Sequence, residues 1–303
     1  MTLHIIRAII HSSINPADHE VSEKEILIMK KYIAFAIALC LALTLFAGCN
    51  SGKSATLKVA ISPDFAPMEF VDPTKTGQDK FVGFDVSLAK FIAQELDMTL
   101  EIMPMDFDAC QAAVASGKVD MSISGFSWTE KREANYNLSD YYYAGENETE
   151  QVLICLKENA GKYTTPESLK GVKVGAQGAS LQEQLVADQL PESELVVYTD
   201  INTGLLQLKK GDFEVMAVAK GNGDALINNN PEITMSGFEF EVDPKMTNNL
   251  ILLQKGNDEL TKKVNEILAK ALAAGYYETW YEEALNTAGV DVSYDVDGNP
   301  ISG

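Results

Sequence analysis

Short apolar strands alternate with amphipathic helices along most of the chain, and this alternation restricts the fold to the α/β class. In the first half, an expected strand at 57–61 precedes a helix that Asp85 can cap. A second strand, at 99–103, leads into a helix from Asp108 that stops at Gly117. Because ligands of open α/β sheets bind beyond the carboxyl ends of the strands, the residues at those ends are candidate site residues.

The second half of the chain repeats the pattern. A strand at 172–176 precedes a helix at 181–189. A helix at 205–210 is then followed by Gly211 and a strand at 213–219, which echoes the helix–glycine–strand unit of the first half. The echo predicts two lobes with related cores, each of which presents residues at the carboxyl ends of its strands.

The segment Ser-Gly-Phe-Ser-Trp-Thr-Glu-Lys-Arg at 124–132 joins an apolar strand at 119–123 to a short helix. It combines the hydroxyl of Ser127, backbone amides beside Gly125 and the guanidinium of Arg132. A guanidinium binds both oxygens of a carboxylate at once, and the amides and the hydroxyl can donate further hydrogen bonds. The segment therefore predicts a receptor for a small carboxylate.

Together with two upstream motifs, this segment resembles the amino-acid family of bacterial extracytoplasmic solute-binding proteins, the capture subunits of ABC importers. The motifs are Asp-Phe-Ala-Pro-Met-Glu-Phe at 64–70 and Val-Gly-Phe-Asp-Val-Ser-Leu-Ala-Lys at 82–90, and the resemblance covers residues 57–284. It implies a two-lobed type II periplasmic-binding-protein fold of the α/β class. Each lobe would be a mixed sheet flanked by helices, and two hinge crossings would join the lobes.

We expect an export signal in the amino-terminal part of the chain. Lys30 and Lys31 precede an apolar run at 32–47, which is shorter than the ~20 residues of a spanning helix. The run ends in Leu-Phe-Ala-Gly-Cys, which looks like a lipobox and makes Cys49 the expected site of lipid attachment. The alternative is an ordinary signal peptide with a coincidental cysteine. Met29 fits a true start, and the residues before it make little sense ahead of an export signal.

The expected organisation follows from this signal and from the resemblance. The chain would cross between the lobes near 150–156 and 247–253, and helices at 259–273 and 276–284 would return to the first lobe. In chain order we expect an over-extended start at 1–28, a lipoprotein signal peptide at 29–48, a tether at 49–56, lobe 1 at 57–151 and 248–285, lobe 2 at 152–247 and a C-terminal tail at 286–303.

Composition excludes several classes of function. The formal net charge of −20 argues against nucleic acid and anionic lipid surfaces as partners. The three histidines all lie at 1–28, so the mature chain has none for catalysis or metal binding. Cys110 and Cys155 are expected to be buried free thiols. We expect no cofactor and no metal, since the acidic loop at 295–299 lacks the glutamate that closes a calcium site.

The resemblance implies roles for individual residues. The expected ligand-binding set comprises a carboxylate clamp (Arg132, Ser127, Gly125 and Ser124), aromatic walls (Phe65, Phe107 and Phe126) and the second-lobe loop that closes over the ligand (Ser180 and Gly178). The structural alternative for the phenylalanines is core packing, and for Ser180 it is a helix cap.

One departure from the family pattern concerns the amino group of the ligand. Relatives end the strand at 213–218 with an aspartate that receives an α-ammonium, but Ala219 and then Lys220 stand here. Asp224 can substitute through a shifted loop, or the ligand lacks a free amino group, or it carries a second acid that pairs with Lys220. Ser62 replaces an acid that reads basic side chains in some relatives, which argues against lysine, arginine or histidine as cargo.

These features predict a monomeric, lipid-anchored binding protein on the outer face of the cell membrane. It would close on an amino acid or related small carboxylate like a hinged trap and deliver it to an ABC permease, without catalysis. Two alternatives remain open. One is an exported cyclohexadienyl or arogenate dehydratase-like enzyme on the same fold, with Glu69 as the candidate acid. The other is a surface adhesin or sensor that retains ligand binding.

Overall fold

The computed structural model describes residues 55–143, 149–289, 293–294 and 300–301. The expected start, the signal peptide, Cys49 and most of the tether and the tail lie outside these residues. Within the described ranges, no helix is long and apolar enough to cross a membrane.

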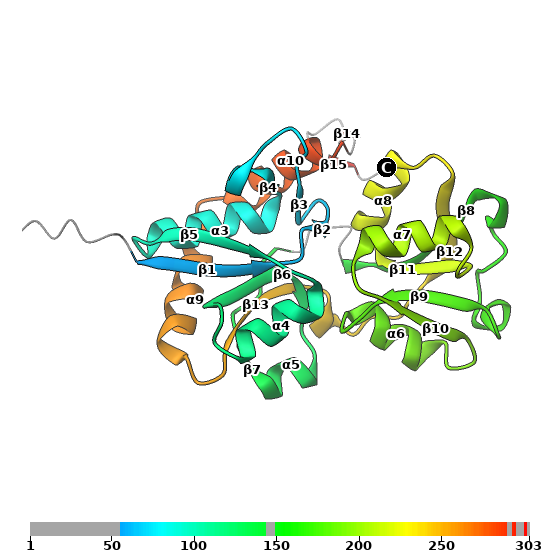
Figure 1. Cartoon of the computed structure of the whole chain (residues 1–303), viewed down its shortest axis with the longest axis horizontal. Helices are drawn as coiled ribbons and strands as arrows, with labels where there is room; N and C mark the ends of the chain where they lie inside the picture. The colour runs from blue at the N-terminus through cyan, green and yellow to red at the C-terminus, as the bar shows by residue number, and fades with distance from the viewer. Residues whose placement is uncertain (1–54, 144–148, 290–292, 295–299, 302–303) are drawn as a thin grey trace, which may run out of the picture. The chain divides into compact units, whose positions relative to one another are not determined.

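The first lobe is built on a five-stranded sheet in the order β5-β1-β6-β13-β7 (Figure 1). Strand β1 runs parallel to β5 and β6, whereas β13 runs antiparallel to β6 and β7, so the sheet is mixed. Its strands are β1 (Thr56–Ile61), β5 (Thr99–Pro104), β6 (Met121–Ser127), β7 (Tyr136–Leu138) and β13 (Asn249–Gln254). Its helices are α3 (Phe84–Glu95), α4 (Phe107–Ala115), α5 (Glu130–Asn135), α9 (Asp258–Ala273) and α10 (Tyr276–Ala288).

The second lobe has a sheet of the same kind, in the order β10-β9-β11-β8-β12. Strand β9 runs parallel to β10 and β11, and β8 runs antiparallel to β11 and β12. The strands are β8 (Gln151–Leu156), β9 (Lys173–Gln177), β10 (Glu194–Tyr198), β11 (Val215–Ala219) and β12 (Ile233–Glu239). The helices are α6 (Leu181–Gln189), α7 (Ile201–Lys210) and α8 (Lys220–Asn229).

Shorter elements complete the described fold. The motif at 64–70 forms part of a small sheet, β2-β3-β4, beside the first lobe. These elements are β2 (Asp64–Phe65), β3 (Glu69–Val71), β4 (Phe81–Val82), β14 (Ser293–Tyr294), β15 (Pro300–Ile301) and the 3-10 turns η1 (Gly77–Lys80), η3 (Lys157–Asn159), η4 (Pro166–Leu169) and η5 (Pro244–Met246).

Each sheet is covered on both faces by a hydrophobic cluster, because alternate residues of its central strands point in opposite directions. In β13, Ile251 and Leu253 pack into the cluster with α3 and α10, whereas Leu250 and Leu252 pack into the cluster with α4. Strand β11 divides its residues between two clusters in the same way. The continuous apolar runs of the sequence are therefore buried central strands, and the two lobes have related cores.

The chain leaves the first sheet after β7 and returns to it at β13. The expected crossings near 150–156 and 247–253 fall largely on β8 and β13, which are strands of the two sheets. These runs are apolar and almost fully buried, so they pair as strands. Tyr142, just before the first crossing, bridges Asn249, just after the second, and this pair joins the two connecting segments.

Several expected element boundaries are corrected by the structure. Strand β6 continues to Ser127, so the first half of the predicted receptor loop is strand. Asp85 does not cap α3, because the helix begins at Phe84 after Gly83 and the Asp85 side chain is buried inside the lobe. Helix α7 begins at Ile201, four residues before the expected 205, because the Asp200 side chain accepts a hydrogen bond from the amide of Thr203 at 2.9 Å.

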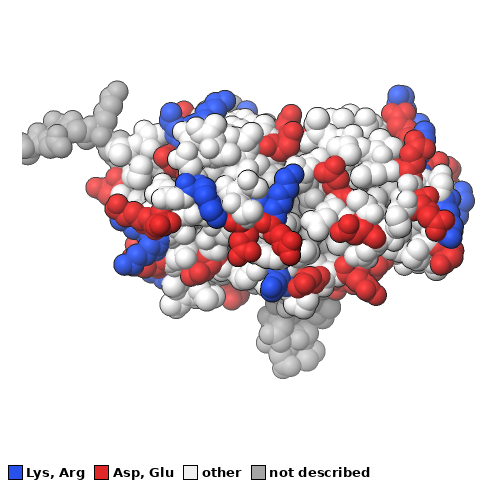
Figure 2. Space-filling view, turned by 90° about the horizontal axis from the view of Figure 1, so that it is seen from below, with Lys and Arg blue, Asp and Glu red and all other residues white. Residues whose placement is uncertain are grey.

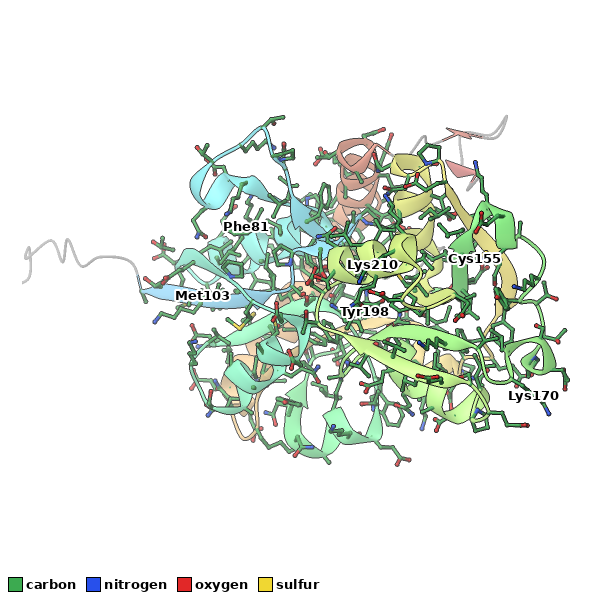
Figure 3. All side chains as sticks on the ribbon, turned by 45° about the vertical axis from the view of Figure 1, so that its right-hand side comes forward. Phe81, Met103, Cys155, Lys170, Tyr198 and Lys210 are labelled. Atoms are coloured by element: carbon green, nitrogen blue, oxygen red, sulfur yellow. The ribbon has the colours of Figure 1, made fainter. Side chains whose placement is uncertain are left out.

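The prediction of two buried free thiols is confirmed. Cys110 lies on α4, and Cys155 lies on β8 among the side chains of the second sheet (Figure 3). Figure 2 shows that, on the face it presents, Lys and Arg side chains stand among acidic ones instead of gathering in one patch.

Candidate functional site

A cavity lies where the carboxyl ends of strands from both sheets meet. It is lined from the first lobe by residues that follow β1 and end β6, and from the second lobe by the ends of β9 and β11. Its volume is about 30 Å³, which corresponds to roughly one or two water molecules. The lobes are therefore closed on each other, and a larger molecule can enter only if they separate.

Arg132 is the central residue of the predicted carboxylate clamp, and it lines this cavity. It is 3% exposed, and it is the only arginine of the chain beyond Arg7. Its Nη1 donates to the carbonyl of Ser127 at 2.7 Å, and its Nη2 donates to the carbonyl of Ala179 at 3.0 Å. The guanidinium also lies 5.1 Å from the ring centre of Phe126. These two carbonyls and the Phe126 ring orient the Arg132 guanidinium without neutralising its positive charge.

Burial lowers the pKa of Arg132 to about 10, so the side chain stays charged at neutral pH. Within the described part of the chain, no carboxylate forms an ion pair with it. A buried cation without a counter-ion is unfavourable, so the Arg132 guanidinium is a candidate partner for an anion.

The other residues of the expected clamp also line the cavity. Ser127 and Ser180 are each 9% exposed, and Ser124 is 1% exposed. Ser180 caps α6 by accepting a hydrogen bond from the amide of Glu183 at 3.1 Å. The amino end of α6, which favours an anion, is thus the second-lobe side of the Arg132 region.

Gly125 is required by a close approach as well as by its backbone conformation. Its φ is 55°, and a Cβ atom there would lie 2.7 Å from the ring of Phe65. Its amide donates to Oδ2 of Asp85 at 2.8 Å. The absence of a side chain lets the Phe65 ring lie against the strand end, where both residues line the cavity.

Only two of the three phenylalanines expected to form the aromatic wall reach the cavity. Phe65 and Phe107 line the cavity, but Phe126 does not, because it is fully buried in the cluster beneath. Its ring centre lies 4.8 Å from that of Phe107. Phe126 therefore supports Phe107 and Arg132 from below.

Neither Lys220 nor Asp224, expected to read the distal group, nor Gly178 of the loop expected to close over the carboxylate, is brought to the cavity. Ala219 lines it, but Gly178, Lys220 and Asp224 do not. Strand β11 ends at Ala219 and α8 begins at the next residue, so no loop exists that could shift Asp224 into the site. Lys220 instead lies with its Nζ 3.4 Å from a carboxylate oxygen of Glu150. Ligand contacts of Gly178, Lys220 and Asp224 stay predictions without support from this geometry.

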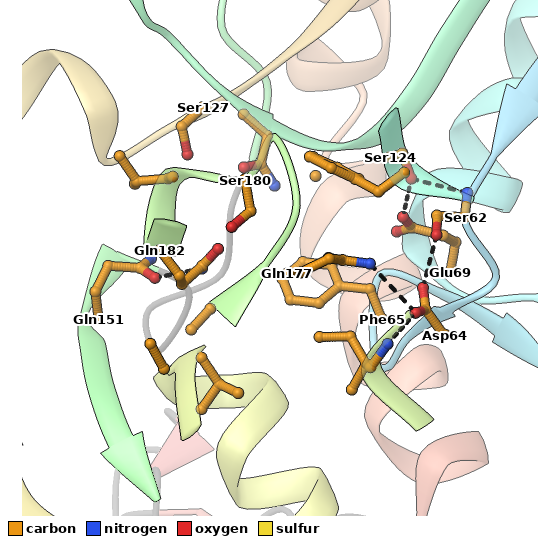
Figure 4. A pocket seen from close by; sticks show the side chains of 18 of the residues that line it. Ser62, Asp64, Phe65, Glu69, Ser124, Ser127, Gln151, Gln177, Ser180 and Gln182 are labelled. Carbon is orange, nitrogen blue, oxygen red and sulfur yellow. Dashed lines mark hydrogen bonds between the residues drawn. The ribbon is translucent and has the colours of Figure 1, made fainter. Parts of the chain in front are cut away.

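Asp64 lines the cavity, although sequence reasoning did not select it. Its Oδ1 accepts from the Ser62 hydroxyl at 2.9 Å, and its Oδ2 accepts from the amide of Ile201 at 2.6 Å and from Nε2 of Gln177 at 3.4 Å (Figure 4). Burial raises the pKa of Asp64 to about 6, in spite of the hydrogen bond from Ile201. The sequence feature that could have identified Asp64 is its position. It is the first residue of the 64–70 motif and lies two residues after Ser62, where some relatives have an acidic residue.

Amide side chains also line the cavity and were missed by sequence reasoning. They are Gln151, Gln177, Gln182 and Asn249. Gln177 ends β9, so the rule for the carboxyl ends of strands pointed to it without distinguishing it from other polar residues. Gln151 and Asn249 begin β8 and β13 and Gln182 lies in α6, so that rule did not point to them.

Glu69 and Asp85 form a buried acidic pair beneath the clamp. Both are fully buried, and only Glu69 reaches the cavity lining. Glu69 accepts a short hydrogen bond from the Ser124 hydroxyl, and Asp85 accepts one from the Tyr142 hydroxyl at 3.0 Å. Burial and the neighbouring Asp85 raise the pKa of Glu69 well above its usual value, and burial raises that of Asp85 to about 6. The pair holds the Ser124–Gly125 strand end in place.

The described residues contain no cluster of three or more His, Cys, Asp or Glu side chains that could hold a metal ion. A closed cavity between two α/β lobes, with a buried unpaired guanidinium at the strand ends, defines a ligand-binding protein of the two-lobed type. Residues 57–287 match the family of bacterial extracellular solute-binding proteins, family 3, and the chain belongs to this family.

Relatives of known ligand are similar over most of their length. The ABC transporter arginine-binding protein 1 of Escherichia coli (strain K12) is 26% identical over 77% of this chain and 93% of its own. An amino acid ABC transporter substrate-binding protein from Streptococcus pneumoniae, solved with L-arginine, is 32% identical with a TM-score of 0.70 over 77% of this chain and 96% of its own. An ancestral arginine-binding protein solved with glutamine is 32% identical with a TM-score of 0.67 over 76% and 97%. The two-lobed type II periplasmic-binding-protein fold expected from the sequence is thus confirmed.

Proposed function

We propose that this protein captures an amino acid or a closely related small carboxylate outside the cytoplasm and delivers it to the permease of an ABC importer. The observation that carries the proposal is Arg132, a buried guanidinium in the cavity with carbonyls but no carboxylate as partners. A ligand carboxylate would satisfy its charge and its fork of donors together. The ligands of the relatives, arginine and glutamine, both have such a group.

Closure of the two lobes is the proposed capture step. When the lobes separate, Arg132 stays with the first lobe and loses the carbonyl of Ala179, which belongs to the second. A ligand carboxylate would then bind Arg132 and Ser127, and the amino end of α6 with Ser180 would close over it. Because the ligand contacts both lobes, it stabilises the closed form, which the permease would recognise.

The protein acts as a monomer in this proposal, and a lipid on Cys49 would hold it at the outer face of the cell membrane. The mass of the mature amino terminus tests this anchor, since acylation at Cys49 adds the mass of the lipid and an unmodified cysteine rules it out. We propose no enzymatic activity. Glu69 is engaged with Ser124 and lies beside the buried Asp85, so its role is to hold the clamp.

The test is a calorimetric titration of the chain from Ser51 onward with amino acids and with amino-free acids. We expect Arg132→Ala to weaken the best ligand by at least about 30-fold, because truncating one partner of a buried charge pair typically costs about 2 kcal/mol or more. Arg132→Lys should retain part of the affinity, since it keeps the charge and loses the fork. Lys131→Ala is the matched control, because Lys131 is exposed and directly precedes Arg132, and its substitution removes one positive charge as Arg132→Ala does. Equal affinities for Arg132→Ala and Lys131→Ala would contradict the proposal.

A further inference from the structure

We infer that the ligand carries a cationic group and that Asp64, a first-lobe residue, receives it in place of an acid at the end of β11. This inference rests on the proposed capture of a small carboxylate. It makes Asp64 the residue that selects among carboxylates, whereas Arg132 binds them all.

The charges of the cavity support this assignment. Arg132 is the one basic residue that lines the described cavity, and Asp64 and Glu69 are its two acidic residues. Glu69 is fully buried beside Asp85 and is bound to the Ser124 hydroxyl, so it offers a ligand less accessible surface than Asp64 does. Asp64 is only partly buried and remains as the acid available to a ligand.

The two charged residues belong to different ends of the cavity. Arg132 donates to the carbonyls of Ser127 and Ala179, and Ala179 directly precedes Ser180. Figure 4 shows Ser127 and Ser180 on one side and Asp64 with Ser62 and Glu69 on the other, with Gln177 between them. A ligand with a carboxylate at one end and a cation at the other matches this arrangement.

The present partners of Asp64 are all neutral donors. They are the Ser62 hydroxyl at 2.9 Å, the Ile201 amide at 2.6 Å and Nε2 of Gln177 at 3.4 Å. No Lys or Arg of the described residues forms an ion pair with Asp64. The contact with Gln177 is long for a hydrogen bond, so a cation can displace it at little loss. A charged donor would then form a stronger bond to the carboxylate.

Other acids near the site are already engaged. Asp200 caps α7 through Thr203, at 2.9 Å from its amide and 2.6 Å from its hydroxyl. Asp224 lies on α8 outside the cavity lining, and β11 ends in Ala219. Asp64 of the first lobe therefore replaces the aspartate that relatives have at the end of the strand corresponding to β11 in the second lobe.

The competing interpretation is that Asp64 only fastens the lobes together, since it already bonds the amino end of α7 at Ile201. The two interpretations differ in what they predict for neutral ligands. A fastening residue would strengthen the binding of every carboxylate equally, because it stabilises closure itself. A residue that receives a cation would strengthen only the ligands that carry one.

The experiment compares, by calorimetry, four acids built on the same five-carbon chain. L-Arginine carries both an α-ammonium and a guanidinium, 5-guanidinopentanoate only the guanidinium, L-norvaline only the α-ammonium, and pentanoate no cation. We expect at least one cationic acid to bind at least about 30-fold more tightly than pentanoate. Norvaline or guanidinopentanoate as the tight ligand would assign the cation to the α-ammonium or to the side chain, and either result supports the inference.

Asp64→Asn should abolish this preference while pentanoate binding changes less than about threefold. Asp64→Glu should retain part of the preference, because it keeps a carboxylate that can accept a charge-assisted hydrogen bond. Asp79→Asn removes the same charge from an exposed position and is the matched control. Equal loss for all four acids in Asp64→Asn would make Asp64 a fastening residue and overturn the inference. The inference would also be overturned if Asp224→Asn, and not Asp64→Asn, abolished the preference for cationic acids. If the unmutated protein binds none of the amino acids or amino-free acids of the wider titration, the proposed function itself fails.

Discussion

At the scale of single residues, the site depends on charges that the protein leaves uncompensated. Arg132 and Asp64 face the cavity with neutral partners, and Glu69 and Asp85 are buried side by side behind it. Such groups destabilise the unliganded fold, because charge is removed from water without a counter-ion. We interpret this as stability given up for ligand binding, with Glu69 and Asp85 keeping the clamp in position.

The buried acids predict the pH dependence of stability without ligand. The pKa values of Asp64 and Asp85 are raised to about 6 in the folded state, and that of Glu69 is raised further. The folded state therefore binds more protons than the unfolded state, so stability should fall as pH rises from about 5 to 7. Urea denaturation at four pH values measures this trend.

Glu69→Gln is the informative comparison for this pH dependence, because glutamine resembles the protonated acid and does not titrate. We expect a shallower dependence in Glu69→Gln, and the same slope as the parent in Asp79→Asn. A parent protein that gains stability between about pH 5 and 7 would refute the assignment of raised pKa values.

At the scale of elements, two helix amino ends of the second lobe meet the two charged residues of the first. Ala179, which precedes α6, accepts from Arg132, and Ile201, the first residue of α7, donates to Asp64. Both helices start directly after a strand or a short turn, so their positions are set by β9 and β10. The sheet of the second lobe thus places the groups that contact the first lobe.

The Ser180 cap predicts a test of the α6 amino end. Ser180→Ala should lower the unfolding free energy by about 1 kcal/mol and should also weaken the ligand, because the helix end lines the cavity. Asn257→Ala removes a comparable cap, that of α9, which accepts from the amide of Leu260 at 3.3 Å. It should lower stability similarly and leave the affinity unchanged. Denaturation and calorimetry on both variants separate the two effects, and unchanged affinity in Ser180→Ala would exclude α6 from the site.

At the scale of the whole molecule, the candidate site needs both lobes, because residues of each line the cavity. The cavity of about 30 Å³ is too small for an amino acid to enter, so binding requires an open form. We expect the lobes to open beside the Tyr142–Asn249 bridge, because opening there would leave the strand pairs of both sheets intact.

This geometry predicts that ligand compacts the protein. Small-angle X-ray scattering should give a smaller radius of gyration with saturating ligand than without it, since the ligand stabilises the closed form. Arg132→Ala should show no such change at the same ligand concentration. Equal radii with and without a ligand that calorimetry shows to be bound would mean that the lobes stay closed and that the ligand enters in another way.

The local sequence pattern was sufficient to predict those elements whose defining residues lie close together in the sequence. The helix at 181–189 and the strand at 57–61 were predicted within one residue, because apolar period and a capping serine define them. Arg132 and Ser127 were predicted for the same reason, since five residues separate them and one strand–helix unit positions both. By contrast, Asp85 was misread as a cap, because its sequence position suits a helix start and only packing shows that it is buried.

The sequence by itself predicted the α/β class, the two buried free thiols and the strand–helix unit in which Arg132 meets Ser127, because each is marked by the residue types along a short stretch of chain. Only the tertiary structure decided which acid and which amides reach the cavity. Asp64 meets Gln177 and Ile201 across 113 and 137 residues. Contacts of that separation depend on how the sheets place their strand ends and how the lobes close, and the residue types near each position leave many pairings open.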